Sequence, residues 1–193
     1  SQLVLACAPV AIGEHWFDAC AGAGGKTLQL ARLVGPTGQV DATDIRPEIL
    51  DELDDRAKRA RLTNVTIVHE ATGHYAGVLV DAPCSGSGTW RRQPHLKWYV
   101  QPATIAAFAK TQQEILTTNA PHVAAGGLLV YATCSLSHHE NGDVVAAFLH
   151  THPQFQAEAP AQSWGGEYDG LGTALLPGTR NTDGFYVALL RRK

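Results

Sequence analysis

Short apolar runs alternate with longer amphipathic segments along most of the chain. Seven runs have the length and apolar character of β-strands: residues 15–20, 38–44, 64–70, 77–81, 127–134, 155–158 and 183–190. Four segments have apolar residues at helical spacing: residues 26–34, 46–62, 104–121 and 139–150. Strands that alternate with helices predict an α/β fold, in which a mostly parallel, seven-stranded sheet forms the middle of three layers. In such a sheet, ligands bind at the carboxyl ends of the strands.

One connection is too short for this pattern. Only residues 71–76 separate the third strand from the fourth, whereas parallel neighbours normally need roughly a dozen residues or more. Two explanations stay open: the connection lacks a helix, or the sequence omits a loop. The chain also begins with Ser1 and contains no methionine, so we interpret residues 1–193 as a fragment that holds a single domain.

Charge and hydropathy then restrict the partners. With 193 residues, 45% of them hydrophobic, the chain suits one globular domain. A formal net charge of −3 excludes an overall basic surface, so affinity for nucleic acid must come from local groups of Lys and Arg. Such groups occur at 56–61, 91–97 and 191–193. No apolar run is long enough to span a membrane, and nothing in the sequence indicates an oligomeric state.

The cysteines lie far apart, with no C-x-x-C pair and no paired histidines at zinc-ligand spacing: Cys7, Cys20, Cys84 and Cys134. No secretory signal is visible. We therefore expect reduced thiols in a cytoplasmic protein, without a bound metal and without a membrane partner. His138 and His139 resemble metal ligands only in isolation, and we expect them at a helix entrance on the surface.

A glycine-rich loop, residues 20–26, joins the first strand to the first helix. It nearly matches the phosphate loop G-x-x-x-x-G-K-T, but Cys20 stands where the first glycine is required, and the dinucleotide fingerprint fails at Thr27. Asp44 follows about twenty residues later at the end of the next strand, where an acid accepts both hydroxyls of a ribose. Glu70, one strand further, can reach an adenine edge. This pattern favours a nucleoside-type cofactor; the alternatives are a helix cap for Asp44 and a plain surface acid for Glu70.

Two strand ends carry a thiol followed by a serine, at Cys84 and Cys134. A single buried cysteine is normally an inert, small hydrophobe, but two in matching surroundings indicate a shared chemical role. The first is followed by a Gly-Ser-Gly loop and by the cations and indoles of residues 90–98. These side chains favour a site for a planar, phosphate-bearing substrate, although such a loop can also be a solvated face, and each Trp can be core packing.

Five segments together resemble, in the same order, the motifs of the RNA (cytosine-5) methyltransferases of the Sun, or RsmB-like, family. They are DACAGAGGKT, ATDIRPEIL, VDAPCSGSGTWRRQPHLKW, GGLLVYATCSLSHHENGDVV and DGFYVALLRRK. The paired DAPCSG and TCS motifs, followed by Glu140-Asn141, are the most specific of these features. The resemblance covers nearly the whole chain and implies the class I methyltransferase fold, S-adenosylmethionine as cofactor, and methylation of cytosine C5 in RNA, for which we expect ribosomal RNA.

The resemblance also implies residue roles. Cys134 is the expected nucleophile, Cys84 the residue that assists product release, and Asp81 lies near the cofactor and the target base, with Lys26 beside it as a fixed cation. The residues expected to bind the cofactor are Cys20, Ala21, Gly22, Ala23, Gly24, Gly25, Lys26, Asp44, Glu70 and Asp81. The cationic and aromatic residues expected to guide RNA are Arg91, Arg92, Lys97 and Trp98.

Two thiols suit this reaction because cytosine C5 is a poor nucleophile until a thiolate has added to C6. The C5 proton must then leave and the thiolate must be expelled. DNA cytosine methyltransferases perform the same reaction with the Pro-Cys thiol, here Cys84, so exchanged roles are one alternative. Others are a non-catalytic domain that binds cofactor and RNA, a transfer RNA target, and a nucleotide hydrolase.

The chain departs from the family's pattern. Gly22-Ala23 replaces an Ala-Pro pair in the first motif, and the short link before Gly77 affects the expected adenine wall. We expect the chain to be a fragment that lacks the family's usual RNA-binding extension.

Overall fold

The computed structural model describes residues 3–161, 165–178 and 182–193. Its α-helices are α1 (Leu3–Ala6), α2 (Thr27–Leu33), α3 (Pro47–Arg59), α4 (Pro102–Asn119) and α5 (Gly142–Thr151). Its strands are β1 (His15–Asp18), β2 (Gln39–Ala42), β3 (Val65–Ile67), β4 (Tyr75–Asp81), β5 (Val123–Thr133), β6 (Phe155–Glu158), β7 (Glu167–Tyr168), β8 (Thr173–Leu175) and β9 (Phe185–Arg192). Short 3₁₀ turns complete the elements: η1 (Ser87–Thr89), η2 (Pro94–Trp98), η3 (Ala120–His122) and η4 (His138–Glu140).

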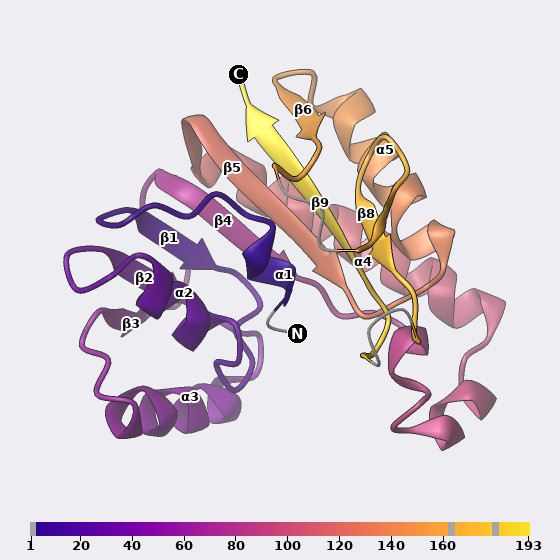
Figure 1. Ribbon diagram of the computed structural model, residues 1–193, viewed down its shortest axis with the longest axis horizontal. Coiled ribbons are helices and arrows are strands. Elements are labelled where there is room, and N and C mark those ends of the chain that lie inside the picture. The colour runs from indigo at the N-terminus through magenta and orange to yellow at the C-terminus, as the bar shows by residue number, and fades with distance from the viewer. Residues whose placement is uncertain (1–2, 162–164, 179–181) are drawn as a thin grey trace.

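All described strands belong to one twisted sheet, with the order β3-β2-β1-β4-β5-β9-β8-β7 and with β6 paired to β9 (Figure 1). The first five strands in this order (β3, β2, β1, β4 and β5) are parallel to one another, and β9 runs antiparallel to β5. The predicted three-layer α/β fold with a mostly parallel central sheet is confirmed. Two short strands, β7 and β8, add to the seven predicted ones, because their few residues lie in a polar, glycine-rich segment without a readable period.

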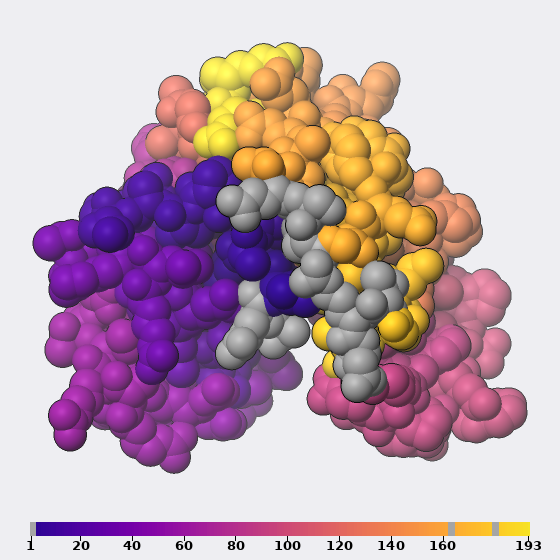
Figure 2. Space-filling model, viewed as in Figure 1, coloured from indigo at the N-terminus to yellow at the C-terminus, as the bar shows by residue number. Residues whose placement is uncertain are grey.

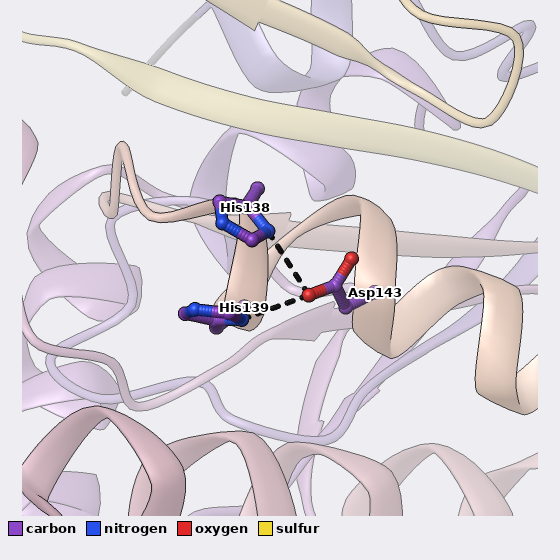
Figure 3. Close-up of side chains that lie close together, drawn as sticks. All are labelled: His138, His139 and Asp143. Atoms are coloured by element: carbon purple, nitrogen blue, oxygen red, sulfur yellow. Dashed lines mark hydrogen bonds and ion pairs between the residues drawn. The ribbon is translucent and has the colours of Figure 1, made fainter. Parts of the chain in front are cut away.

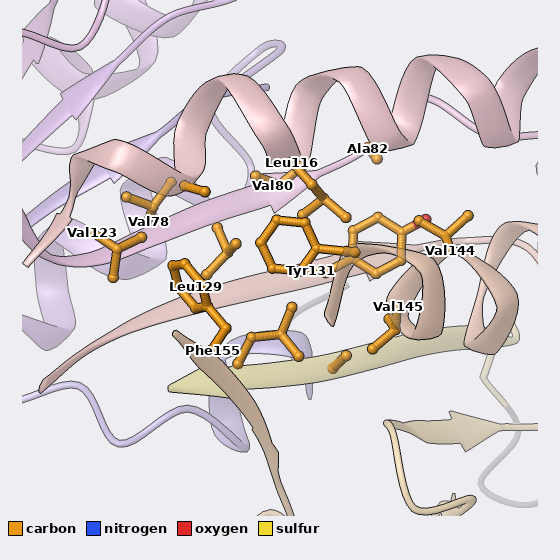
Figure 4. Packing of buried hydrophobic residues seen from close by; sticks show 14 of the residues in the cluster. Val78, Val80, Ala82, Leu116, Val123, Leu129, Tyr131, Val144, Val145 and Phe155 are labelled. Carbon is orange, nitrogen blue, oxygen red and sulfur yellow. The ribbon is translucent and has the colours of Figure 1, made fainter. Parts of the chain in front are cut away.

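Alternate residues of the central strands face opposite helix layers. Trp16 and Leu79 pack with residues of α1 and α2, whereas the neighbouring Phe17 and Val80 pack with residues of α4 and α5. Figure 4 shows the second core, in which side chains of β4 and β5 lie beneath α4 and beside α5. Both faces of the parallel strands are therefore buried, as their continuous apolar sequences predict.

The segment between β3 and β4 explains the short connection. Because β2 and β1 lie between these two strands in the sheet, residues 68–74 cross the sheet, and they do so without a helix. Val68 and Ala71 pack on the α4 side of the sheet, where a crossover helix would normally lie. Tyr75 fixes the end of this crossing by donating a hydrogen bond to Asp41 Oδ2 at 3.1 Å. The residues present in this connection therefore cross the sheet without a helix.

The sequence of α3 matches its place beside the glycine-rich loop. Pro47 occupies the first turn, where a missing N–H has no cost, and the basic residues of the last turn complement the helix dipole. Leu50 and Leu53 face inward and pack on Ala21 and Ala42. The helix thus supports the loop that follows β1.

None of the helices in the described parts of the chain is long and apolar enough to cross a bilayer.

Candidate active site

The carboxyl ends of β1, β2, β4 and β5 meet at one edge of the sheet, as the predicted topology requires. The surface is hollowed there, between the α3 side and the segment that leads into α4 (Figure 2). A cavity of about 830 Å³ lies at this edge. Its walls come from the glycine-rich loop, the end of β2, the end of β4 and the inner face of α4.

The glycine-rich loop bends tightly around the Asp44 carboxylate. Gly22 donates its N–H to Asp44 Oδ2 at 2.8 Å, while Arg46 donates to Oδ1 through its backbone N–H at 3.0 Å and through Nε at 2.9 Å. Burial raises the pKa of Asp44, but the hydrogen bonds from Arg46 and Gly22 outweigh burial and lower that pKa below its ordinary value. Asp44 therefore presents an ionised carboxylate to the cavity.

Gly24 supports the loop from behind instead of lining the cavity. Its φ is +84°, and a Cβ at this position would lie 2.9 Å from Leu53 Cγ. A side chain here would push the loop away from α3. Gly24 therefore packs against α3 and is not among the residues that line the cavity. The other loop residues predicted to bind the cofactor do line it: Cys20, Ala21, Gly22, Ala23, Gly25 and Lys26.

Beneath the loop lies a buried carboxyl group that the sequence analysis did not single out. Thr27 Oγ1 donates to Asp18 Oδ2 at 2.8 Å, and the Cys20 N–H donates to Oδ1 at 3.3 Å. Burial, aided by the nearby Asp81 charge and opposed by the hydrogen bond from Thr27, raises the pKa of Asp18 to about 7. The position of Asp18 at the end of the first strand was the available signal. Its contacts show a role in holding the loop.

Lys26 and Asp81 form an ion pair across the cavity floor. Their side chains are mostly buried, at 13% and 34% exposure, and both line the cavity. The structure therefore brings these two predicted residues together, beside the thiols.

The two thiols are in contact. Cys84 Sγ and Cys134 Sγ lie 3.3 Å apart, although 50 positions separate them in the sequence. The hydrogen bond donated by Cys84 lowers the pKa of Cys134, and the Lys26 ammonium lowers it too, against burial and the Asp81 charge. The same hydrogen bond, together with burial, raises the pKa of Cys84. Cys134 is therefore the thiol that ionises first, with Cys84 as its proton-bearing neighbour.

A buried carboxylate holds the two thiol loops together. Glu140 is fully buried and accepts hydrogen bonds from the Ser85 N–H at 2.8 Å, the Ser85 hydroxyl at 2.5 Å and the Ser135 hydroxyl at 2.7 Å. Gln112 Nε2 of α4 donates to it at 3.3 Å. Each serine directly follows one of the thiols, so Glu140 fixes both loops. The sequence analysis noted the Glu140-Asn141 pair without assigning it a role.

A second cavity, of about 440 Å³, opens on the other side of the thiols. Its walls include both thiols, Arg92 and Thr104. Only Cys84 and Phe108 are common to the linings of both cavities. The two cavities thus meet at Cys84, with Phe108 of α4 along the same boundary.

The residues predicted to guide RNA lie on the exposed segment that borders this second cavity. Arg92 forms an ion pair with Asp183 at 2.5 Å and also lines the cavity. Arg91 is exposed, and Lys97 Nζ lies 4.7 Å from the centroid of the Trp98 ring. Trp98 is 74% exposed, so the alternative of core packing is wrong for this residue. The segment thus presents cations and an indole to the solvent.

Glu70 does not join the site. It is exposed and absent from the lining of the larger cavity. Because β3 ends at Ile67 at the sheet's edge, with β2 and β1 between it and β4, the residues that follow turn into the crossing segment. The prediction that Glu70 reaches an adenine edge is therefore not supported by this geometry, and the alternative of a surface acid describes its position.

His138 and His139 lie at the entrance of α5, as expected, and both bond to one carboxylate oxygen (Figure 3). The distances from their Nδ1 atoms to Asp143 Oδ2 are 3.0 Å and 2.9 Å. All three side chains are exposed. Cys7 is buried against the Val4 carbonyl oxygen, and its burial raises its pKa to about 11, as expected for an inert thiol.

The residues of the larger cavity fit a nucleoside-type cofactor. The ionised Asp44 carboxylate suits ribose hydroxyls, the loop supplies close backbone, and Ile45, which is 96% exposed, offers an apolar surface for a flat ring. The cations in the lining, Lys26 and Arg46, are both paired with carboxylates. A triphosphate would need free cations, so the fit to a nucleotide hydrolase is poor.

Comparisons with known proteins agree with this geometry. Residues 4–191 match the family described as 16S rRNA methyltransferase RsmB/F. Ribosomal RNA small subunit methyltransferase B of Salmonella paratyphi A is 38% identical over 191 residues, and its probable counterpart in Synechocystis sp. is 37% identical over 194 residues. The alignments cover 94% and 93% of this chain but only 43% of each relative.

Solved structures show the same likeness. NSun6 from Pyrococcus horikoshii, solved with SFG, superposes with a TM-score of 0.87 at 26% identity, over 99% of this chain and 51% of that one. A methyltransferase homologue from the same organism gives a TM-score of 0.82 at 26% identity, over 98% of this chain and 65% of that one.

Proposed function

Since the chain belongs to the 16S rRNA methyltransferase RsmB/F family, we propose that it transfers a methyl group from S-adenosylmethionine to C5 of a cytosine in ribosomal RNA. The observation that carries this proposal is the contact of two thiols, 3.3 Å apart, at the junction of two cavities. The larger cavity suits the cofactor and the smaller one suits an unpaired base. Because the thiols must stay reduced, the protein acts in the cytoplasm.

The larger cavity holds the cofactor through the residues that line it. Asp44 accepts the ribose hydroxyls, Ile45 covers the adenine, and the backbone of residues 20–26 surrounds the methionine part. When bound, S-adenosylmethionine supplies an electrophilic methyl group on a sulfonium centre. The Asp81 carboxylate lines this cavity, is held in place by Lys26 and would stabilise that positive charge.

Cys134 starts the reaction as a thiolate. Its sulfur adds to C6 of the cytosine, the C5–C6 π electrons move onto the ring, and C5 becomes nucleophilic. C5 then forms a bond to the methyl carbon as the methyl–sulfur bond breaks and its electron pair stays on sulfur. Asp81 shares a proton on the N3 side of the base and offsets the charge that develops there.

Cys84 serves the release step. The adduct carries both the new methyl group and a proton on C5, and aromaticity returns when that proton leaves. A base that the Cys84 thiol positions accepts the C5 proton; the C–H electrons re-form the double bond, and the Cys134 sulfur is expelled from C6 as a thiolate. The raised pKa of Cys84 keeps this thiol protonated beside the departing sulfur.

The segment of residues 90–99 guides the RNA. Arg91, Arg92 and Lys97 contact phosphates, and Trp98 stacks on an unpaired base. The target cytosine must be unpaired or flipped to expose C6, so it enters the smaller cavity from this segment. These contacts are local, which agrees with a net charge of −3.

The test compares Cys84→Ala with Cys134→Ala. Each variant is incubated with S-adenosylmethionine and ribosomal RNA, then denatured, and protein linked to RNA is measured on a gel. We expect a linked species with Cys84→Ala, because release is blocked, and none with Cys134→Ala. Cys7→Ala is the matched control and should behave as the unaltered chain.

The other outcomes decide between the alternatives. If only Cys134→Ala gives protein linked to RNA, then Cys84 is the nucleophile, as in DNA cytosine methyltransferases. This result would overturn the assignment of Cys134 as the nucleophile. Cofactor binding by the full-length protein without 5-methylcytosine in the RNA would favour a non-catalytic binding domain. Methylation of transfer RNA in place of ribosomal RNA would correct the substrate and leave the reaction unchanged.

A further inference from the structure

We propose that Cys84 and Cys134 form an oxidative modification site, in which a peroxide converts the two thiols into an intramolecular disulfide that stops the enzyme. That the bond forms rests on the 3.3 Å contact of the two sulfur atoms, with the lowered pKa of Cys134 as support. That it inactivates the protein rests on the proposed function, which needs both sulfur atoms free.

The two strand ends that lead to the thiols are hydrogen-bonded neighbours. Both cysteines lie just beyond the ends of β4 and β5, where Asp81 pairs with Ala132 and the Ala82 N–H donates to Ala132 O at 2.9 Å. Neighbouring strands lie about 4.8 Å apart, and disulfides span Cα separations of about 4.4–6.8 Å. The sulfur atoms, 3.3 Å apart, need to approach by little more than about 1 Å to reach bonding distance. Side-chain rotation supplies such a change.

The surrounding contacts hold both thiol loops in this arrangement. Ser85 and Ser135 are fixed to Glu140, and the Gly88 N–H donates to Cys134 O at 2.8 Å. These bonds fix the backbone next to each thiol. The pair is therefore preorganised for closure.

Among the four cysteines, the reactivity is confined to this pair. Cys134 has a lowered pKa and lines an open cavity, the two features that make a thiol sensitive to peroxide. Burial raises the pKa of both Cys7 and Cys20, so each stays a thiol at neutral pH. Cys84 stands where a resolving cysteine is required.

The reaction balances with hydrogen peroxide as the oxidant. The Cys134 thiolate attacks one peroxide oxygen, the O–O bond breaks, and with one proton taken up the products are Cys134 sulfenic acid and water. The Cys84 thiol, losing its proton, attacks the sulfenic sulfur; the S–S bond forms, the S–O bond breaks, and a second water leaves. Two electrons pass from the sulfur pair to the peroxide.

The experiment treats the reduced chain with hydrogen peroxide and blocks the remaining free thiols with iodoacetamide in denaturant. The sample is then reduced, newly released thiols are labelled with N-ethylmaleimide, and peptides are identified by mass spectrometry. We expect Cys84 and Cys134 to carry the second label together, while Cys7 and Cys20 carry the first. Cys7→Ser, the matched control, should give the same pattern. In Cys84→Ser, Cys134 should instead oxidise to a sulfinic acid that dithiothreitol does not reverse.

Activity separates the two parts of the proposal. Peroxide should abolish methyl transfer in the unaltered chain, and dithiothreitol should restore it. Free Cys84 and Cys134 after peroxide, or a bond from either to Cys20, would overturn the modification site. A disulfide that forms while the enzyme keeps its activity would overturn the switch. A disulfide in a chain that transfers no methyl group even when reduced would refute the proposed function and leave the site standing.

Discussion

The Ser85 hydroxyl donates a hydrogen bond of 2.5 Å to the Glu140 carboxylate, across 55 positions of sequence. The same oxygen of Glu140 accepts from the Ser135 hydroxyl at 2.7 Å. Because each serine directly follows a thiol, one buried carboxylate sets the spacing of the two sulfur atoms. Chemistry that needs both thiols thus depends on a residue that contacts neither of them.

Glu140→Gln should therefore damage both stability and catalysis. In this variant an N–H₂ group replaces one carboxylate oxygen and faces hydrogen-bond donors, to which it cannot bond. A buried polar group without a partner costs about 1–3 kcal/mol. We expect a lower free energy of unfolding in urea and slower formation of the Cys84→Ala adduct with RNA in the combined variant. Glu52→Gln, on the exposed face of α3, is the control. Equal adduct rates with and without Glu140→Gln would refute the positioning role.

Asp18 predicts a pH dependence of stability with a definite sign. Its pKa is about 7 in the folded chain against an ordinary value of 3.8, so the folded state holds a proton that the unfolded state releases. The folded state therefore loses up to a few kcal/mol of stability as pH rises from about 4 to about 7. Asp18→Asn removes this dependence and keeps an oxygen that accepts from Thr27.

The measurement is the melting temperature of both proteins between about pH 4 and about pH 8, a range that contains this change. As pH rises, the melting temperature of Asp18→Asn should increase relative to that of the unaltered chain. Asp51→Asn on α3 controls for the loss of a surface charge. Parallel curves for all proteins would contradict the raised pKa.

Gly88→Ala should push the backbone of residue 88 away from the backbone of Gly184 and of Cys134. A Cβ at Gly88 would lie 2.1 Å from Gly184 O and 2.8 Å from Cys134 O, and both contacts are with backbone. Such overpacking costs about 1–3 kcal/mol. We expect a lower melting temperature and weaker RNA linkage, whereas Gly73→Ala, which meets no atom within 4 Å, should change neither. A normal melting temperature for Gly88→Ala would show that β9 yields easily.

Asp44→Asn should weaken S-adenosylmethionine binding, measured by isothermal titration calorimetry. The amide forms weaker hydrogen bonds with ribose hydroxyls and with the Gly22 N–H, and losing a charged hydrogen bond lowers affinity about tenfold or more. Because Glu70 lies outside the cavity lining, Glu70→Gln should leave the affinity nearly unchanged. A similar loss in both variants would show that the segment after β3 closes over the cofactor.

The sequence predicted those parts of the fold that depend on local periodicity. Apolar runs placed the central strands, and their acidic or thiol-bearing ends placed Asp44, Asp81, Cys84 and Cys134 at one edge. This worked because the carboxyl ends of parallel strands must converge. β7 and β8 escaped prediction because two or three residues do not establish a period.

The remainder depended on contacts between distant segments. Nothing in the run of residues near Glu140 indicates that it is fully buried and bonded to two serines. The partnership of Arg92 with Asp183 is equally non-local. Glu70 was misplaced because its role assumed an ordinary crossing after β3, and the short segment 68–74 takes a different course.

The position of β9 has a consequence for biosynthesis. β9 pairs with β5, β6 and β8, yet residues 135–184 emerge between Cys134 and this strand. Until then, one edge of β5 is open, and Gly184 has not bonded to Gly88, the residue that supports Cys134. Such high contact order makes sheet closure a late and slow folding event. A nascent chain on the ribosome therefore lacks the support of Gly88 beside Cys134 until the residues that lead into β9 have been synthesised.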